Sequence, residues 1–167
     1  MALTIRPATA GDAALILRFI TDLAVYEKAG DQVAATAETI ATSLFGEHSP
    51  SKALICDLDG KPVGFAVYFF SYSTWQAKPG LYLEDLYVSP EARGQGTGKH
   101  LLQHLAGIAL ENGCGRFEWS VLDWNEPAIA FYQSLGAKPQ EEWIRYRVEG
   151  DAIRTLALSP SHSIVSG

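Results

Sequence analysis

The sequence predicts an α/β fold, with a mixed central sheet of about seven strands flanked by four helices. Three observations support this prediction. Segments with strand-like alternation and segments with helix-like spacing follow one another along the 167 residues. Glycine, proline and capping residues separate most of these segments. Neither an internal repeat nor a linker interrupts the order, so residues 1–167 are expected to form a single domain, with 159–167 as a tail.

The first half of the chain predicts one strand, two helices and three further strands. Asp12 and Thr36 stand where N-cap residues would, each ahead of apolar residues at helical spacing. Asp59 and Gly60 predict a two-residue hairpin turn, because both central positions of that turn prefer positive φ. In order, the segments are a strand at 3–7, helices at 12–28 and 36–45, and strands at 53–58, 63–72 and 81–88.

The second half predicts two helices, a strand between them and a closing hairpin. Gly113 follows the last apolar residue of one helical pattern and is expected to end it. Asn125 is expected to cap the next helix, with Pro127 in its first turn, where proline is tolerated. The segments are a helix at 99–112, a strand at 116–122, a helix at 125–135, and hairpin strands at 143–148 and 152–158.

Composition and charge exclude several classes of function. The net charge of -6 argues against a nucleic-acid or anionic-membrane partner, because both need a cationic face. No apolar run is long enough to span a bilayer and no secretory signal is visible, so the cytoplasm is the expected location. Cys56 and Cys114 stand in unrelated contexts and are interpreted as ordinary thiols, and no histidine spacing predicts a metal site.

A glycine-rich segment, Arg93 to Gly98, lies between a predicted strand and a predicted helix. Glycines let the backbone approach a ligand closely, and the N–H groups of a first helical turn favour a phosphate. A dinucleotide fingerprint would need glycine at Lys99, and a P-loop would need Ser or Thr at His100. The pattern R-x-x-G-x-G therefore predicts an anion-binding loop of another type. The alternative is a tight turn that binds nothing.

This pattern resembles the pyrophosphate-binding motif of the GNAT family of N-acetyltransferases, and the predicted element order resembles that family's fold. The resemblance extends to the spermidine/spermine and thialysine N-acetyltransferase group. Within that group, segments 72–75 and 121–124 are more similar to the thialysine branch. The segments that carry the resemblance are 5–9, 23–27, 45–48, 82–85, 121–125, 130–132, 135–137 and 142–143.

The resemblance implies acetyl transfer from acetyl-CoA to the primary amine of a small cationic molecule, without a metal. That molecule would be a thialysine-like or lysine-like amine, a diamine or a polyamine. Ser73 stands near a position where the polyamine branch typically carries an acidic residue, which weakens the case for long polyamines. The residues implied to bind acetyl-CoA are Leu86, Tyr87, Val88, Arg93, Gly94, Gln95, Gly96, Thr97, Gly98, Lys99, Asn125, Pro127, Ala128 and Tyr132.

Two residues are candidates for the proton transfers that this chemistry needs. An alkylamine has a pKa of about 10.4, so a proton must leave before or during attack. Glu84 can hold the ammonium and accept that proton directly or through water, whereas in a regular strand its neighbour Asp85 points to the opposite face. The resemblance assigns Tyr132 the donation of a proton to the departing thiolate. Backbone N–H groups around 86–88 can stabilise the carbonyl oxygen if a bulge leaves them unpaired.

Further residues are implied to contact the acceptor amine, and each has an ordinary structural alternative. The side chains of Trp75, Trp124 and Trp143 could offer aromatic faces to an ammonium, or simply pack in the core. Glu84 could likewise be a solvated carboxylate or a salt-bridge partner. The acceptor-contacting residues implied by the resemblance are Tyr26, Glu27, Glu84, Glu118, Trp119 and Ser120.

Two other functions stay open at this point. One is an acetyltransferase for a peptide or protein amine, which would need an open groove. The other is a non-catalytic acyl-CoA-binding module, which could dispense with Glu84 and Tyr132. The resembled enzymes also imply a homodimer, and the predicted C-terminal hairpin is a reasonable element to exchange contacts between two copies.

Overall fold

The computed structural model describes residues 2–160 of the chain. The chain divides after Trp124 into two compact units. We call them the N-terminal unit, which holds the sheet, and the C-terminal unit, which begins at Asn125. Most of the predicted tail, residues 161–167, lies outside the described residues.

The N-terminal unit is built on a five-stranded sheet in the order β1-β2-β3-β4-β5. Neighbouring strands are antiparallel from β1 to β4, and β5 runs parallel to β4. Asp59 and Gly60 join β2 to β3 with φ values of 52° and 82°, which confirms the predicted turn. The strands are β1 (Leu3–Pro7), β2 (Ser51–Leu58), β3 (Lys61–Ser73), β4 (Lys78–Val88) and β5 (Arg116–Trp119).

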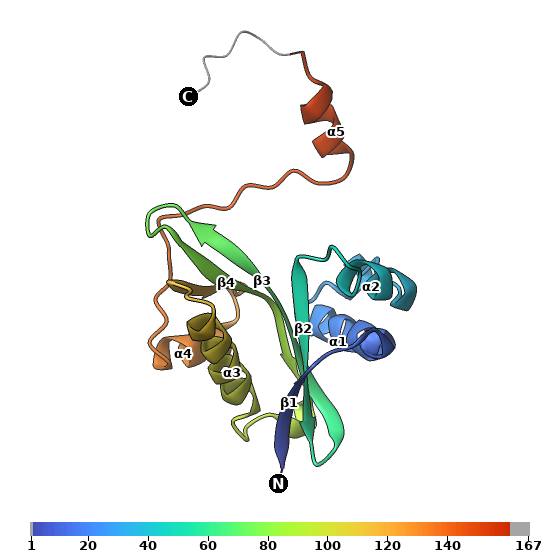
Figure 1. Cartoon of the computed structure of the whole chain (residues 1–167), viewed down its shortest axis with the longest axis vertical. Helices are drawn as coiled ribbons and strands as arrows, with labels where there is room; N and C mark the ends of the chain where they lie inside the picture. Colours follow the sequence, from blue (N-terminus) through green and yellow to red (C-terminus); the bar gives the residue numbers. More distant parts are fainter. Residues whose placement is uncertain (1, 161–167) are drawn as a thin grey trace. The chain divides into compact units, whose positions relative to one another are not determined.

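Helices cover both faces of this sheet, with α1 and α2 on one face and α3 on the other (Figure 1). Thr36 caps α2 as the sequence predicts, because its Oγ1 accepts the backbone N–H of Thr39 at 3.1 Å. The helices are α1 (Ala13–Tyr26), α2 (Ala37–Leu44) and α3 (Thr97–Glu111), with short 3₁₀ turns η1 (Ala10–Asp12), η2 (Gly30–Gln32) and η3 (Pro90–Ala92).

An aromatic cluster fills the core between α1 and the sheet. Phe19 of α1 and Phe65 of β3 are fully buried, and their stacked rings have centroids 5.6 Å apart. Tyr87 of β4 packs against Phe19 with a centroid distance of 6.0 Å. Burying each such side chain stabilises the fold by roughly 1.5–3 kcal/mol. The core therefore holds α1 against the last residues of β4, and both of these elements contribute to the candidate site.

Ion pairs tie β1 to the start of α1 and to β2. Arg6 donates through its two Nη atoms to the Asp12 carboxylate at 2.9 and 3.0 Å, and through Nε to Asp57 at 3.2 Å. Asp12 occupies the predicted N-cap position of α1, but its carboxylate accepts the backbone N–H of Thr9 and no helix N–H. The hydrogen bonds from Arg6 are the main reason that the pKa of Asp12 is lowered.

The described part of the C-terminal unit, residues 125–160, contains two helices and no strand. Helix α4 (Glu126–Ser134) forms as predicted, but the predicted hairpin of 143–148 and 152–158 is wrong. Residues 143–149 form no ladder, and helix α5 (Asp151–Leu158) follows them. Gly150, with φ 58° and ψ −133°, has a backbone conformation that essentially only glycine adopts.

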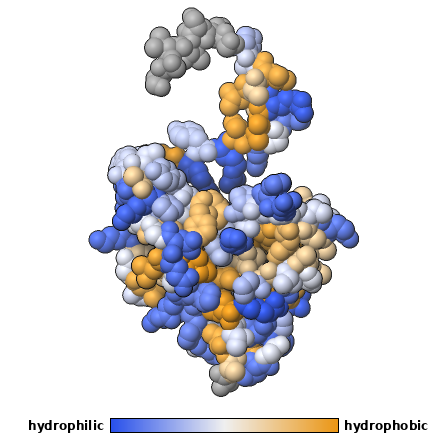
Figure 2. All heavy atoms as spheres, viewed as in Figure 1, coloured by the Kyte–Doolittle hydropathy of each residue, from blue (hydrophilic) through white to orange (hydrophobic). Residues whose placement is uncertain are grey.

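The physical reason for this error lies in the spacing of the apolar residues. Ile153, Leu156 and Ala157 fall at i, i+3 and i+4, which places them on one side of a helix. The hairpin was predicted around a turn at Glu149, Gly150 and Asp151, but Gly150 and Asp151 instead stand where α5 begins. Figure 2 shows apolar atoms gathered on one side of α5.

The predicted α/β fold class is confirmed, but the predicted numbers of strands and helices are wrong. The described residues form five strands and five α-helices, in place of about seven strands and four helices. Strand β5 covers only Arg116–Trp119, whereas the sequence predicts a strand over 116–122. Across residues 2–160, no helix is long and apolar enough to cross a membrane.

Candidate functional site

The glycine-rich segment connects η3 to α3, and two of its side chains hydrogen-bond back to η3. Gly94 and Gly96 have φ values of 75° and 79°, in the left-handed region that favours glycine. The side chains of Gln95 and Thr97 each donate to a backbone carbonyl of η3 at 3.0 Å. These two bonds tie the loop to η3 on both sides of Gly96.

Six consecutive backbone N–H groups, those of residues 94–99, donate to no protein acceptor within the part of the chain that the structure describes. The next N–H group, that of His100, donates to the Gly96 carbonyl at 2.9 Å and starts the hydrogen bonding of α3. The start of a helix carries the positive end of its dipole, and Lys99 adds a formal charge there. This arrangement is typical of an anion-binding loop.

Gly98 leaves open space beside the first turn of α3. It lies in the first turn of α3, and a Cβ built on it would meet no atom of the chain within 4 Å. Glycine inside a helix is about 1 kcal/mol less favourable than alanine. Packing within the chain therefore gives no reason for a glycine at this position, whereas close approach by another molecule does.

Arg93 braces the loop against the end of α1 and the end of β4. Its Nε donates to the Val88 carbonyl at 2.8 Å. Its Cζ lies 5.4 Å from the ring centroid of Tyr26 and 5.4 Å from that of Tyr87. Arg93 thereby brings Tyr26, a predicted acceptor-contacting residue, beside the predicted cofactor loop.

Strand β4 carries a bulge at Glu84. On the β3 side, Leu83 and Asp85 pair with consecutive residues, Tyr68 and Val67, so Glu84 is the extra residue. The regular alternation that the sequence predicts for Glu84 and Asp85 therefore does not hold. The role predicted for the N–H groups around 86–88 is conditional on a bulge, and the structure has one at Glu84, two residues earlier.

Beyond the bulge, β4 leaves β5. The last pair of the β4–β5 ladder is Leu83 with Trp119. Residues 86–88 stay paired with β3 on one side, and within residues 2–160 no strand pairs with them on the other side. The strand edge that the resemblance assigns to the acetyl group is thus not part of the β4–β5 ladder.

Three carboxylates gather where β4 approaches the end of α1. The pKa of Asp85 is raised to about 6, first by burial and then by the carboxylates of Glu84 and Glu27. Burial also raises the pKa of Glu27. Glu84 is exposed to solvent. This concentration of negative charge suits a cationic ligand.

The predicted residues at the end of β5 lie against β4. Glu118 pairs with Tyr82, and Ser120 Oγ lies 2.8 Å from the Tyr82 hydroxyl. Trp119 packs edge-on against Phe117 with a centroid distance of 4.9 Å. Glu118, Trp119 and Ser120 are therefore next to the bulge, on the side where the two strands separate.

Four predicted cofactor residues belong to α4 in the C-terminal unit. Asn125 caps this helix, since its Oδ1 accepts the backbone N–H of Ala128 at 3.4 Å, and Pro127 lies in the first turn. The rings of Phe131 and Tyr132 are tilted by 46° with centroids 5.6 Å apart. The predicted cap is confirmed, and the cofactor role of these residues stays a prediction.

Sequence reasoning missed one residue of this region, Lys28. Its Nζ lies 4.0 Å from the ring centroid of Trp124. Its position directly after Glu27 could have marked Lys28 as a candidate site residue. Its contact with Trp124 could not be predicted, because the two residues are far apart in the sequence. Across residues 2–160, no cluster of three or more His, Cys, Asp and Glu side chains could hold a metal ion.

Comparisons with known proteins identify the family. The sequence model described as the acetyltransferase (GNAT) family matches residues 19–137. A thialysine N-epsilon-acetyltransferase from Sus scrofa is 43% identical over 164 residues, which cover 92% of this chain and 96% of that protein. A spermidine/spermine N(1)-acetyltransferase-like protein 1 from Homo sapiens is 36% identical over 92% of this chain and 23% of that protein.

A solved structure has a similar fold. An integron cassette protein from the mobile metagenome of V. cholerae superposes with a TM-score of 0.81 at 32% identity. The superposition covers 95% of this chain and 99% of that one. The family match spans strands β2 to β5, the glycine-rich loop and α4. This chain therefore belongs to the GNAT family and is an acetyltransferase.

Proposed function

We infer that this enzyme transfers an acetyl group from acetyl-CoA to the primary amine of a small cationic molecule. The run of six N–H groups at 94–99, which donate to no acceptor among the described residues, is the observation that carries the cosubstrate assignment. A diphosphate offers several acceptor oxygens and negative charge, which match these donors and the dipole of α3. The acidic cluster of Glu27, Glu84 and Asp85 supports a cationic acceptor.

Different segments of this chain then have distinct roles in binding acetyl-CoA. The loop from Arg93 to Lys99 binds the diphosphate through its backbone. Residues 86–88 offer backbone donors to the thioester carbonyl at the open edge of β4. Asn125, Pro127 and Ala128, at the start of α4, also bind acetyl-CoA. Acetyl-CoA supplies the activated acetyl group.

Glu84 and Tyr132 carry the two proton transfers. Glu84 takes a proton from the substrate ammonium, directly or through water, so that the neutral nitrogen attacks the carbonyl carbon. The new C–N bond forms as the C–S bond breaks, and the thiolate takes a proton from the Tyr132 hydroxyl. The products are an amide and a free thiol, so no oxidant or reductant is needed. This proposal requires Glu84 and Tyr132 to face one thioester in the working enzyme.

The acceptor class is a thialysine-like or lysine-like amine, or a diamine or polyamine. The relatives named thialysine N-epsilon-acetyltransferase support the first of these. Tyr26, Glu27, Glu118, Trp119 and Ser120 contact this acceptor together with Glu84. The acidic cluster supports a small cation over a peptide amine, because its charge is concentrated in one place.

Two measurements test this function. Calorimetric titration with acetyl-CoA should show saturable binding at one site per chain. A thiol-release assay should then show turnover with one or more of thialysine, lysine, putrescine, spermidine and spermine. Binding without release for every amine would favour a peptide acceptor or a binding module. The absence of any acetyl-CoA binding would remove the whole proposal.

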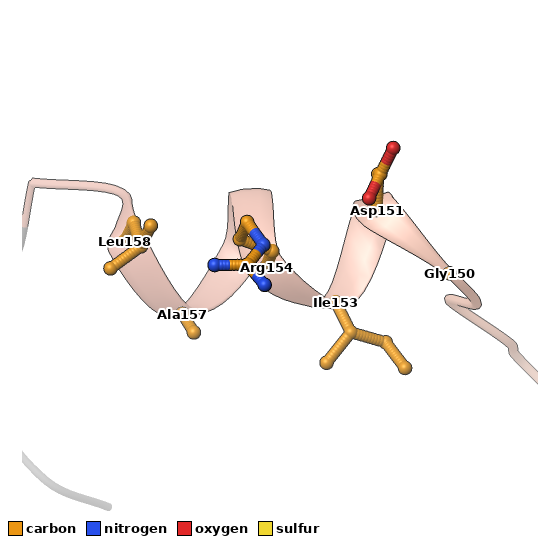
Figure 3. A pocket seen from close by; sticks show the side chains of 6 residues that line it. All are labelled: Gly150, Asp151, Ile153, Arg154, Ala157 and Leu158. Carbon is orange, nitrogen blue, oxygen red and sulfur yellow. The ribbon is translucent and has the colours of Figure 1, made fainter.

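We also propose that the enzyme works as a homodimer. The supporting observation is the exposure of large apolar side chains along 143–158, among them Trp143, Ile144, Tyr146 and Ile153. Monomers rarely expose so many apolar side chains in one stretch. Figure 3 shows Ile153, Ala157 and Leu158 lining a hollow beside α5, together with Gly150, Asp151 and Arg154. Sedimentation equilibrium should give twice the chain mass, and Ile153→Asp should shift that equilibrium toward monomer.

A further inference from the structure

Lys28 has an unusual backbone position at the end of α1. The Lys28 N–H donates to Val25 at 3.0 Å and the Ala29 N–H to Ala24 at 2.8 Å, a pair of bonds typical of a Schellman motif. Lys28 takes the position of that motif that usually holds glycine, and its φ is 62°. Because these bonds fix the backbone at Lys28, they also fix the position from which its side chain extends.

The side chain of Lys28 ends on an aromatic face. Its Nζ lies 4.0 Å from the ring centroid of Trp124, well within the range of a cation–π contact. Trp124 keeps 41% of its surface exposed, so the ring is accessible from solvent as well. The face of Trp124 that could hold a substrate ammonium is therefore already used by an ammonium of the protein.

The surroundings of Lys28 carry the opposite charge. Glu27 is its neighbour in the chain, and the Glu27 carboxylate acts on Asp85, next to Glu84. Lys28 thus follows directly in the chain on a residue of the acidic cluster. Glu27 and Lys28 carry opposite charges, which are the complement of the ammonium and carboxylate of an α-amino acid.

We propose that Lys28 determines the specificity of this enzyme, by favouring acceptors with a carboxylate at the end remote from the reacting amine. Its ammonium repels acceptors that carry only a second ammonium there. This inference rests on the proposed function, because it assumes that the acceptor amine lies at Glu84. Lys28 does not touch the reacting atoms, so its effect is on acceptor selection and not on the chemical step.

Lysine and 1,5-diaminopentane form a matched pair of probes, since they differ only by the α-carboxylate. The test compares kcat/KM for the two acceptors in the wild type, in Lys28→Met and in Lys28→Arg. In Lys28→Met, the ratio for lysine over the diamine should fall by at least roughly fivefold, through KM, because one unit charge is lost near the carboxylate. Lys28→Arg keeps the charge, and its ratio should stay within about twofold of the wild type.

Two further measurements keep the test decisive. Lys28→Gly suits the left-handed backbone and should fold at least as well as the wild type, while showing the same loss of preference as Lys28→Met. Raising the salt concentration should reduce the preference in the wild type and leave it unchanged in Lys28→Met. An equal change for both acceptors, or no change, would overturn the role of Lys28. If the wild type acetylates no amine at all, the proposed function fails instead.

Discussion

The two sides of the candidate site are built in different ways. The loop at 94–99 offers backbone N–H groups from one continuous segment. The acceptor side uses side chains from three separate segments, at 26–28, 84–85 and 118–124. A continuous backbone site can be predicted from a local pattern, whereas an assembled side-chain site depends on the fold. The two sides should also respond differently to mutation, and the first two predictions below test that difference.

The largest effects are expected where side chains take part in the chemical step. Glu84→Gln and Tyr132→Phe should each lower kcat by about 100-fold or more, the usual range for loss of a general acid or base. Neither change alters the backbone of the loop, so the affinity for acetyl-CoA should stay within about threefold in both. Steady-state kinetics and calorimetry on the same preparations check this. Full turnover in both variants would exclude the assigned roles.

The next effect separates ligand binding from folding. Gly98→Ala should weaken acetyl-CoA binding by roughly tenfold or more, because a methyl group would stand where the ligand approaches. The same change should raise the free energy of unfolding by up to about 1 kcal/mol, since alanine favours a helix. Gly107→Ala is the matched control in the same helix, because a Cβ there also meets nothing of the chain within 4 Å. It should stabilise the protein without changing acetyl-CoA affinity.

A third prediction concerns residues remote from both sides. Asp12→Ala removes the partner of Arg6 and should lower the free energy of unfolding by about 1–3 kcal/mol at pH 7, with kcat unchanged. The folded-state pKa of Asp12 is lowered, so its contribution is complete above the unfolded pKa and disappears as the pH falls through the folded value. Denaturant titrations at pH 7 and pH 3 measure the difference. Glu91→Gln, which breaks an exposed pair with Lys61, is the control and should cost less than about 0.5 kcal/mol.

The smallest expected effect concerns Asp85, on the acceptor side, and the pH dependence of the protein's stability. The pKa of Asp85 is raised to about 6, so its ionised form is disfavoured in the folded state. Wild-type stability should therefore fall as the pH rises from the unfolded value of 3.8 through about 6. Asp85→Asn should remove this dependence and melt slightly higher than the wild type at pH 7.5. An identical slope between pH 4 and pH 7 in both proteins would show that Asp85 stays ionised throughout.

The hairpin error and the bulge at Glu84 have a common origin. In both places the sequence suggests a regular strand, and the sequence alone does not show how, or whether, that strand pairs with another. The ladder beyond Leu83 ends because β5 ends at Trp119, and 143–149 form no ladder. The apolar residues of α5 follow the helical spacing, and its backbone is helical from Asp151 to Leu158.

The sequence by itself determined the fold class, the caps at Thr36 and Asn125, the turn at Asp59 and the glycine-rich loop. Each of these depends on residues within a few positions of one another, and local conformational preferences are sufficient to specify them. Only the tertiary structure decided that the guanidinium of Arg93 contacts the rings of Tyr26 and Tyr87. The same holds for the effect of the Glu27 carboxylate on the pKa of Asp85, and for the contact of the Lys28 ammonium with the ring of Trp124. These contacts join residues far apart in the chain, and packing of α1 against β4 is what brings them together.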